Sequence, residues 1–263
     1  MRHVARLVIR MDELTALPAF QDNYIWLLRN RAGDAVVVDP GDAAPVLRAI
    51  RNGIRVIAIF ITHHHADHIG GLKELRKTCG ATVYGPDDPR IEGIDLIVRE
   101  GDRITLPEIG DFRVWEVPGH TRSHIAYVGM QQVFCGDTLF SMGCGRLFEG
   151  SPTQMLASLD RLAALPDQTQ VCCTHEYTLA NARFACAAEP DNPARSQWIA
   201  QCQDKRRMDL ATLPSTIAIE KACNPFLRVD FPEQLLGLKK HLGSMPADRL
   251  ERFAALRAWK DAF

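Results

Sequence analysis

Seven consecutive residues in the first third of the chain carry four imidazoles and one carboxylate. They read Thr-His-His-His-Ala-Asp-His over residues 62–68, after the apolar run 57–61 and before Gly70 and Gly71. Imidazole nitrogen and carboxylate oxygen are ligands that Zn²⁺ and neighbouring transition metals accept. The segment lies where a buried strand would reach the surface. We therefore predict a metal site; a purification tag would be terminal and would lack the acid.

The spacing within this segment suits two ions better than one. On an extended backbone His63 and His65 fall on the same side and can bind one metal, whereas His64 points away. Asp67 and His68 come after a turn, where they can face a second ion.

Four other positions place a potential ligand just after a strand-like run. They are His120 in Pro-Gly-His-Thr, Asp137 in Cys-Gly-Asp-Thr, His175 in Cys-Thr-His-Glu and Asp39 in Val-Asp-Pro-Gly. Each is weak alone, because a single histidine after a strand is more often a surface or hydrogen-bonded residue. Together they complete two ligand sets: His63, His65 and His120 for one ion, Asp67, His68 and His175 for the other, and Asp137 shared by both. A shared carboxylate is expected because two nearby cations repel each other.

Two further residues, Asp39 and His124, are not assigned as metal ligands. Asp39 either orients a ligand imidazole through its other nitrogen or is an ordinary acid at a strand end, and both interpretations stay open. His124, four residues after His120, is not expected to bind metal, because both sets are already complete and it leads into a strand at 125–128.

The composition of the 263 residues limits the possible partners. With 31 basic and 32 acidic residues the net charge is −1, which gives no overall field for nucleic acid or membrane. No apolar stretch approaches the roughly 20 residues that span a bilayer, and basic residues interrupt any signal-like core at the start. We expect a cytoplasmic monomer that binds neither nucleic acid nor membrane. Residues 1–10 are a possible N-terminal extension, because Met11 could be an alternative start.

Apolar, β-branched runs alternate with helix-forming stretches over residues 11–177, which predicts an α/β layered catalytic domain. Strands are expected at 24–28, 35–38, 56–61, 81–84, 112–117, 125–128, 133–135 and 170–173. Helices are expected at 43–52, 72–78 and 152–164. Residues 178–263 contain five helix-forming stretches and no convincing strand, which predicts a smaller, all-helical C-terminal domain.

The motifs, in their order along the chain, resemble one family. Thr-His-His-His-Ala-Asp-His-Ile-Gly-Gly, Pro-Gly-His-Thr, Cys-Gly-Asp-Thr-Leu-Phe and Thr-His-Glu-Tyr-Thr are similar to the metallo-β-lactamase superfamily, and specifically to the glyoxalase II (hydroxyacylglutathione hydrolase) family. The resemblance runs from Phe20 to the C-terminus, and segments 143–150 and 224–228 carry its family-specific part. It implies an αββα sandwich of two mixed sheets with the site at one edge. It also implies a helical domain that helps to bind glutathione.

The resemblance also implies a set of substrate contacts. Glutathione would meet Arg146, Tyr177, Arg257, Lys260 and the side chain at position 148. Many relatives have Tyr where this chain has Phe148, so one hydroxyl contact is lost, at a cost of about 0.5–1.5 kcal/mol in binding. From the residues alone, Arg257 and Lys260 share a helix face and either meet substrate carboxylates or merely solvate a terminal helix.

The implied reaction is hydrolysis of the thioester S-D-lactoylglutathione, and of other S-2-hydroxyacylglutathiones, to glutathione and a 2-hydroxy acid. This is the second step of methylglyoxal detoxification. Two divalent ions, zinc first with iron or manganese as alternatives, would lower the pKa of a shared water from about 15.7 to about 7. The metal-bridged hydroxide would be the nucleophile, held by Asp137 and oriented by Asp67. A thiol of pKa about 8.5 leaves as thiolate, so no general acid is needed.

Several alternatives remain at this stage. The fold could serve a β-lactamase, a lactonase or an RNA-processing nuclease, although a signal peptide and a basic exosite are not seen. A mononuclear iron persulfide dioxygenase would use a subset of the ligands, and the full second set of Asp67, His68 and His175 argues against it. A non-enzymatic metal-binding or nucleic-acid-binding scaffold would be favoured if ligands were missing.

Overall fold

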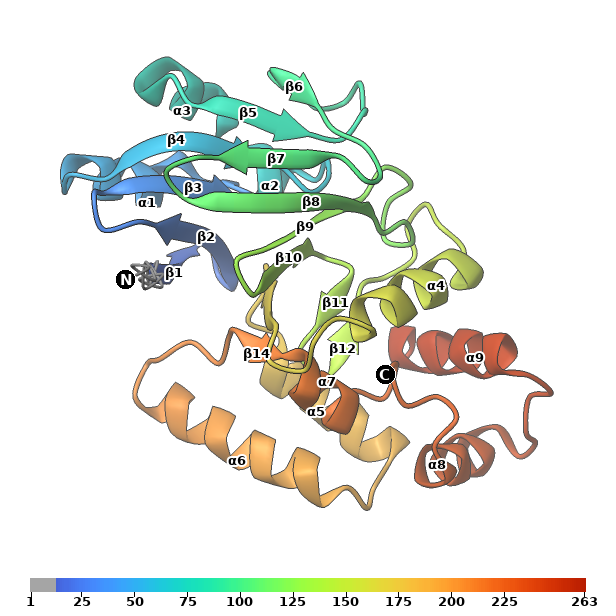
Figure 1. The fold of residues 1–263 in the computed structure, drawn as a ribbon. Coiled ribbons are helices and arrows are strands. Elements are labelled where there is room, and N and C mark those ends of the chain that lie inside the picture. The colour runs from blue at the N-terminus through green and yellow to red at the C-terminus, as the bar shows by residue number, and fades with distance from the viewer. Residues whose placement is uncertain (1–12) are drawn as a thin grey trace, which may run out of the picture.

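The computed structural model describes residues 13–263 and shows a two-sheet sandwich with a helical region packed against one end (Figure 1). The possible N-terminal extension, residues 1–10, lies outside the described part of the chain. None of the described helices is long and apolar enough to cross a membrane.

The first sheet has six strands in the order β1-β2-β3-β4-β5-β6. They are β1 (Glu13–Ala19), β2 (Asn23–Arg29), β3 (Asp34–Val38), β4 (Arg55–Phe60), β5 (Thr82–Gly85) and β6 (Leu96–Ile97). Strands β3 to β6 run parallel, whereas β1, β2 and β3 pair antiparallel. Helices α1 (Ala43–Arg51) and α3 (Leu72–Cys79) cover its outer face. Strand β3 is therefore buried on both sides, which explains the apolar run that follows its first residue, Asp34.

The second sheet has the order β14-β13-β10-β9-β8-β7. Its strands are β7 (Arg103–Leu106), β8 (Gly110–Glu116), β9 (Ile125–Gly129), β10 (Gln132–Gly136), β13 (Gln170–Cys173) and β14 (Ser215–Thr216). Helix α4 (Pro152–Ala163) begins with a capping box between Ser151 and Gln154. Between the sheets the ring of Phe60 stacks on Tyr127 at 4.3 Å and meets Phe112 edge-on at 5.1 Å. The predicted αββα sandwich is confirmed.

The structure contains strands that the sequence patterns did not predict. Strand β1 contains Pro18 and lies at a sheet edge, where a residue without an N–H is tolerated. Strand β7 is a short edge strand that buries only alternate residues. Strand β14 contradicts the expectation that residues 178–263 hold no strand: its two residues pair with Gln170 and Val171. The short hairpin β11 (Leu139–Phe140) and β12 (Gly143–Cys144) was also missed.

The helical region packs against that hairpin. It consists of α5 (Thr178–Ala188), α6 (Pro193–Arg207), α7 (Ile217–Cys223), α8 (Pro232–Leu242) and α9 (Arg249–Asp261). The fully buried side chain of Asn224 donates from Nδ2 to the carbonyls of Phe140 at 3.0 Å and Gly143 at 2.9 Å. The carboxylate of Glu220 accepts from the N–H of Met142 at 2.9 Å. These bonds join the helices to the hairpin that leads into the loop 145–150.

Replacing Asn224 with alanine should lower the free energy of unfolding by about 2–4 kcal/mol, because two buried carbonyl oxygens lose their donor. Urea denaturation followed by circular dichroism measures the change. Asn52→Ala, at an exposed helix end, is the matched control and should change stability by less than about 0.5 kcal/mol. Equal stability of the two variants would show that the Asn224 bonds do not hold the helices in place.

Candidate metal centre

The ends of several strands converge at one edge of the sandwich. Strand β4 ends at Phe60, and the chain then runs through His63 to His65, which begins the short helix α2 (Ala66–Ile69). Asp137 follows β10 directly, and His175 follows β13 after one residue. Because β10 and β13 are parallel neighbours, their carboxyl ends meet at the same edge. His120 comes from the loop after β8.

The first ligand group brings together His63, His65, His120 and Asp137. Nδ1 of His65 lies 3.1 Å from Nε2 of His63 and 3.0 Å from Nε2 of His120. Nε2 of His120 lies 3.5 Å from Oδ2 of Asp137. Atoms bound to one tetrahedral ion at 2.0–2.1 Å are about 3.3–3.4 Å apart. The spacing of this group is that of ligands around a single ion.

The second group consists of Asp67, His68 and His175, with Asp137 again at its side. Oδ1 of Asp137 lies 3.4 Å from Nε2 of His68 and 3.4 Å from Nε2 of His175. Oδ2 of Asp67 lies 3.4 Å from the same nitrogen of His175 and 3.6 Å from that of His68. Asp137 therefore directs one oxygen to each group, as the sequence predicted for a shared ligand.

Two buried atoms at this point lack a hydrogen-bond partner among the described residues: Nε2 of His68 and Oδ1 of Asp137. Buried polar atoms without partners are rare, and each costs free energy. The two atoms face each other across the second group. A divalent cation between them would satisfy both, so the residues present fit the metal that the ligand types indicate.

In four of the five ligand histidines, the ring nitrogen turned away from the centre is held by another group. His63 Nδ1 lies 3.0 Å from Thr62 Oγ1, His68 Nδ1 3.0 Å from Asp39 Oδ2, His120 Nδ1 2.9 Å from the Arg146 carbonyl, and His175 Nδ1 2.8 Å from Asp22 Oδ1. Such contacts fix the orientation of a ligand imidazole and the nitrogen it offers to the metal. The structure thus places Asp39 against a ligand imidazole, the first of its two open interpretations.

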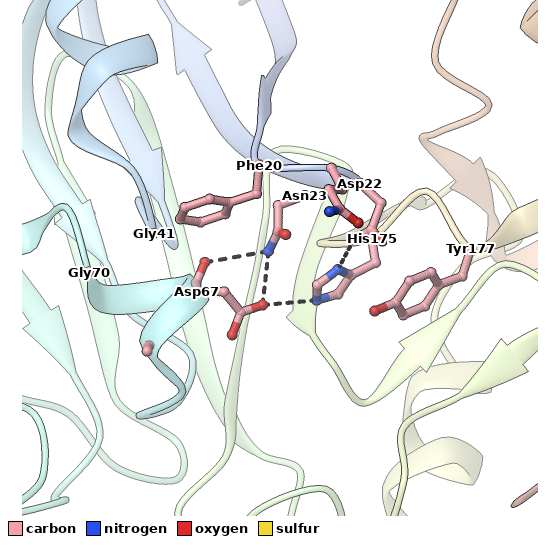
Figure 2. Close-up of a pocket in the computed structure, with 10 residues that line it drawn as sticks. Phe20, Asp22, Asn23, Gly41, Asp67, Gly70, His175 and Tyr177 are labelled. Atoms are coloured by element: carbon pink, nitrogen blue, oxygen red, sulfur yellow. Dashed lines mark hydrogen bonds and ion pairs between the residues drawn. The ribbon is translucent and has the colours of Figure 1, made fainter.

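Sequence reasoning missed Asp22, which lies in the connection between β1 and β2, and Asn23, the first residue of β2 (Figure 2). Asp22 contacts His175, and Nδ2 of Asn23 donates to Oδ2 of Asp67 at 2.9 Å. Two neighbouring residues therefore orient two ligands of the second group. Their only sequence signal is a polar pair between two apolar runs, which is also typical of an ordinary turn.

Burial and the facing carboxylates set the protonation of the histidines. Burial holds the pKa of His63 well below its usual value, so this imidazole is neutral. Burial also opposes protonation of His175, but Asp137 and Asp67 outweigh it and raise its pKa to about 11. Asp137 and Asp39 likewise outweigh burial at His68 and raise its pKa to about 10. Protons and a cation therefore compete for the same nitrogens.

Two nearby histidines lie outside both groups. The ring of His64 points away, with its nitrogens 3.5 Å from Asp88 and 3.7 Å from Glu149. His124 is fully buried, and its Nδ1 lies 3.1 Å from the Ile125 carbonyl while its Nε2 accepts from the N–H of Asp137 at 3.2 Å. With both nitrogens engaged by main chain, His124 supports Asp137.

A cavity of about 430 Å³ opens beside the first group. The predicted substrate contacts all line it: Arg146, Phe148, Tyr177, Arg257 and Lys260. Arg257 is buried, donating to the Cys144 carbonyl and to Asp261, so the alternative that it merely solvates the last helix is wrong. Burial, together with the charges of Arg257 and Arg146, lowers the pKa of Lys260. The wall of the cavity therefore carries positive charge that an anionic ligand would offset.

Comparison with known proteins agrees with this geometry. Residues 20–175 match the family model of the metallo-beta-lactamase superfamily, and residues 176–263 match that of the hydroxyacylglutathione hydrolase C-terminus. Curated relatives named hydroxyacylglutathione hydrolase include one from Xanthomonas campestris pv. campestris (strain B100), 53% identical over 95% of this chain and 98% of its own, and one from Nitrosomonas eutropha, 48% identical over 96% and 100%.

Solved structures share the fold. The crystal structure of ETHE1 from Myxococcus xanthus is 28% identical, with a TM-score of 0.61 over 95% of this chain and 99% of that one. TTHA1623 in a di-iron-bound form is 27% identical, with a TM-score of 0.57 over 82% and 100%. The profile matches span both parts of the chain, and the relatives are similar over nearly its full length. The chain belongs to the metallo-β-lactamase superfamily and, within it, to the hydroxyacylglutathione hydrolase family.

Proposed function

We propose that the protein hydrolyses S-D-lactoylglutathione and related S-2-hydroxyacylglutathiones to glutathione and a 2-hydroxy acid. The observation that carries this proposal is the position of Asp137, which faces both ligand groups and lines the cation-walled cavity. The names of the curated relatives support the same reaction. The lactonase and persulfide dioxygenase alternatives are not favoured.

The site would hold two divalent cations, His63, His65 and His120 binding one, Asp67, His68 and His175 the other, and Asp137 both. Bound there, the cations would polarise the thioester carbonyl and lower the pKa of a shared water from about 15.7 toward about 7. Zinc is our first assignment and iron or manganese are the alternatives, since histidine and carboxylate ligands accept all three. The di-iron form of TTHA1623 supports iron as an alternative.

Side chains at the mouth of the site would position the reactants. Asp67 is 41% exposed at its side chain and is held by Asn23, so its carboxylate can accept a hydrogen bond from the attacking water. Tyr177 stacks on His175, with ring centroids 4.6 Å apart. Burial raises the pKa of Tyr177, so its hydroxyl remains a donor toward the substrate.

The cavity would hold the glutathione half of the substrate. Glutathione carries two carboxylates, and Arg146 and Lys260 offer them charge in a protein with no net positive charge. The departing thiol has a pKa near 8.5, so it leaves as thiolate without a proton donor. Phe148 supplies a ring but no hydroxyl at this wall, at the cost of one hydrogen bond.

We also propose that the protein acts in the cytoplasm as a monomer. One chain carries both ligand groups and the lined cavity, so no second copy is needed to complete the site. None of the eight cysteines, all in the described part of the chain, forms a disulfide, as is usual in a reducing compartment. Residues 11–177 would form the catalytic domain and residues 178–263 the helical glutathione-binding domain, a division that nearly coincides with the two family matches.

Purified protein should hydrolyse S-D-lactoylglutathione, followed by the loss of thioester absorbance, and should contain about two metal ions per chain by mass spectrometry of the same sample. Inactivity of a fully metallated sample would instead favour the lactonase or dioxygenase alternatives.

Asp137→Ala should lower kcat/KM by at least about a thousandfold, because both cations lose a shared charge worth several kcal/mol in the transition state. Metal content should fall to one ion per chain or less. His65→Ala should also lose metal, whereas His64→Ala, which changes an imidazole of the same segment that points away, should keep two ions. Near-normal hydrolysis by Asp137→Ala would refute the two-metal assignment.

Metal binding should release at least two protons per chain, because His68 and His175, with pKa values of about 10 and 11 in the metal-free protein, are protonated at neutral pH and must become neutral to bind. Lower pH favours the protonated form, so affinity should fall by up to about 100-fold per pH unit below pH 10. Calorimetric titration in buffers of different ionisation enthalpy counts the protons. Release of fewer than one proton would show that these imidazoles are already neutral.

A further inference from the structure

A second hollow, of about 710 Å³, opens beside the second ligand group, and Figure 2 shows the residues that line it. Asp67 and His175 line this hollow, whereas His120 and Asp137 line the cation-walled cavity, and Tyr177 lines both. The two openings therefore flank the place where the ligands converge. A substrate with its reacting carbon at that place has room on both sides.

The two openings differ in charge. Arg146, Arg257 and Lys260 line the cavity. The hollow is lined by Asp22 and Asp67, with no lysine or arginine among its described lining residues. Each of these carboxylates is bonded within the protein, to His175 and Asn23 respectively. The anionic half of a thioester is therefore attracted to the cavity, whereas no cationic side chain among the described lining residues of the hollow attracts it.

Phe20 and two glycines, Gly41 and Gly70, line the hollow beside Asp67. A Cβ on Gly41 would come within 1.8 Å of the Asp67 carbonyl oxygen, and one on Gly70 within 2.6 Å of the Gly41 oxygen, so neither position can carry a side chain. Phe20 lies in the left-handed region at φ 51° and is 60% exposed beside these glycines (Figure 2). Non-glycine residues held in the left-handed region cluster at active sites and ligand-binding sites.

We propose that this hollow is the acyl-group subsite and that it selects neutral acyl groups, aromatic ones included, over acyl groups that carry a carboxylate. The inference rests on the proposed thioesterase function, because glutathione in the cavity leaves the acyl group to extend past Asp67 toward Phe20. The volume of the hollow leaves room for bulky substituents, Phe20 contacts apolar ones, and no lysine or arginine among the described lining residues can hold a carboxylate.

The test compares kcat/KM for S-lactoyl-, S-mandeloyl- and S-succinylglutathione. Phe20→Ala should lower the mandeloyl-to-lactoyl ratio by about tenfold, the size expected when part of a phenyl contact is lost. Gln21 is an exposed lining residue that contacts no ligand, and Gln21→Lys should raise the succinyl-to-lactoyl ratio by about three- to fivefold. Gln21→Glu, nearly identical in shape to the native residue, should lower it.

Lys260→Ala is the matched comparison on the other side of the site, and it should change all three thioesters by the same factor. Equal effects of the Phe20 and Gln21 variants on all three would overturn the acyl subsite while leaving the proposed function intact. Failure of the metallated wild-type protein to hydrolyse any of the three would overturn the proposed function itself.

Discussion

The buried carboxylate of Asp137 is the constraint on which the site depends. Burial alone would raise its pKa, but His68 and His175 hold that pKa well below its usual value, so the group stays ionised. An ionised carboxylate surrounded by imidazoles is stable only where positive charge is supplied. The strand ends, the turn residues and the supporting hydrogen bonds all serve to bring that charge to one point.

The conformation of the main chain also determines where the carboxylate of Asp137 lies. Gly136 has φ 47°, and a Cβ there would lie 2.4 Å from Thr62 Oγ1 and 2.9 Å from the ring of His124. Only glycine lets β10 end close enough to His124 for its ring to accept from the N–H of Asp137. The glycine that the sequence shows before Asp137 is thus a packing requirement, and it fixes how deeply the shared carboxylate is set.

Much of the fold and of the candidate site could be predicted from sequence, for identifiable reasons. Strands buried on both faces, such as β3 and β4, are apolar after their first residue, and a histidine or aspartate just after such a strand must emerge at its end. The short edge strands β7 and β14 could not be predicted, because two to four residues carry too little pattern. Asp22 and Asn23 were missed because their role depends on their contact with His175, which lies 153 residues after Asp22 in the chain. Only the folded structure brings the start of β2 beside His175.

Position 146 serves the two halves of the site with different atoms. Its carbonyl oxygen orients His120, while its side chain lines the cavity. Any amino acid has the carbonyl, so the side chain can be exchanged without disturbing the imidazole. The metal centre can thus stay constant while the residue that lines the cavity changes. Because the backbone and the side chain of one residue have separate roles, the same catalytic scaffold can evolve to accept new substrates.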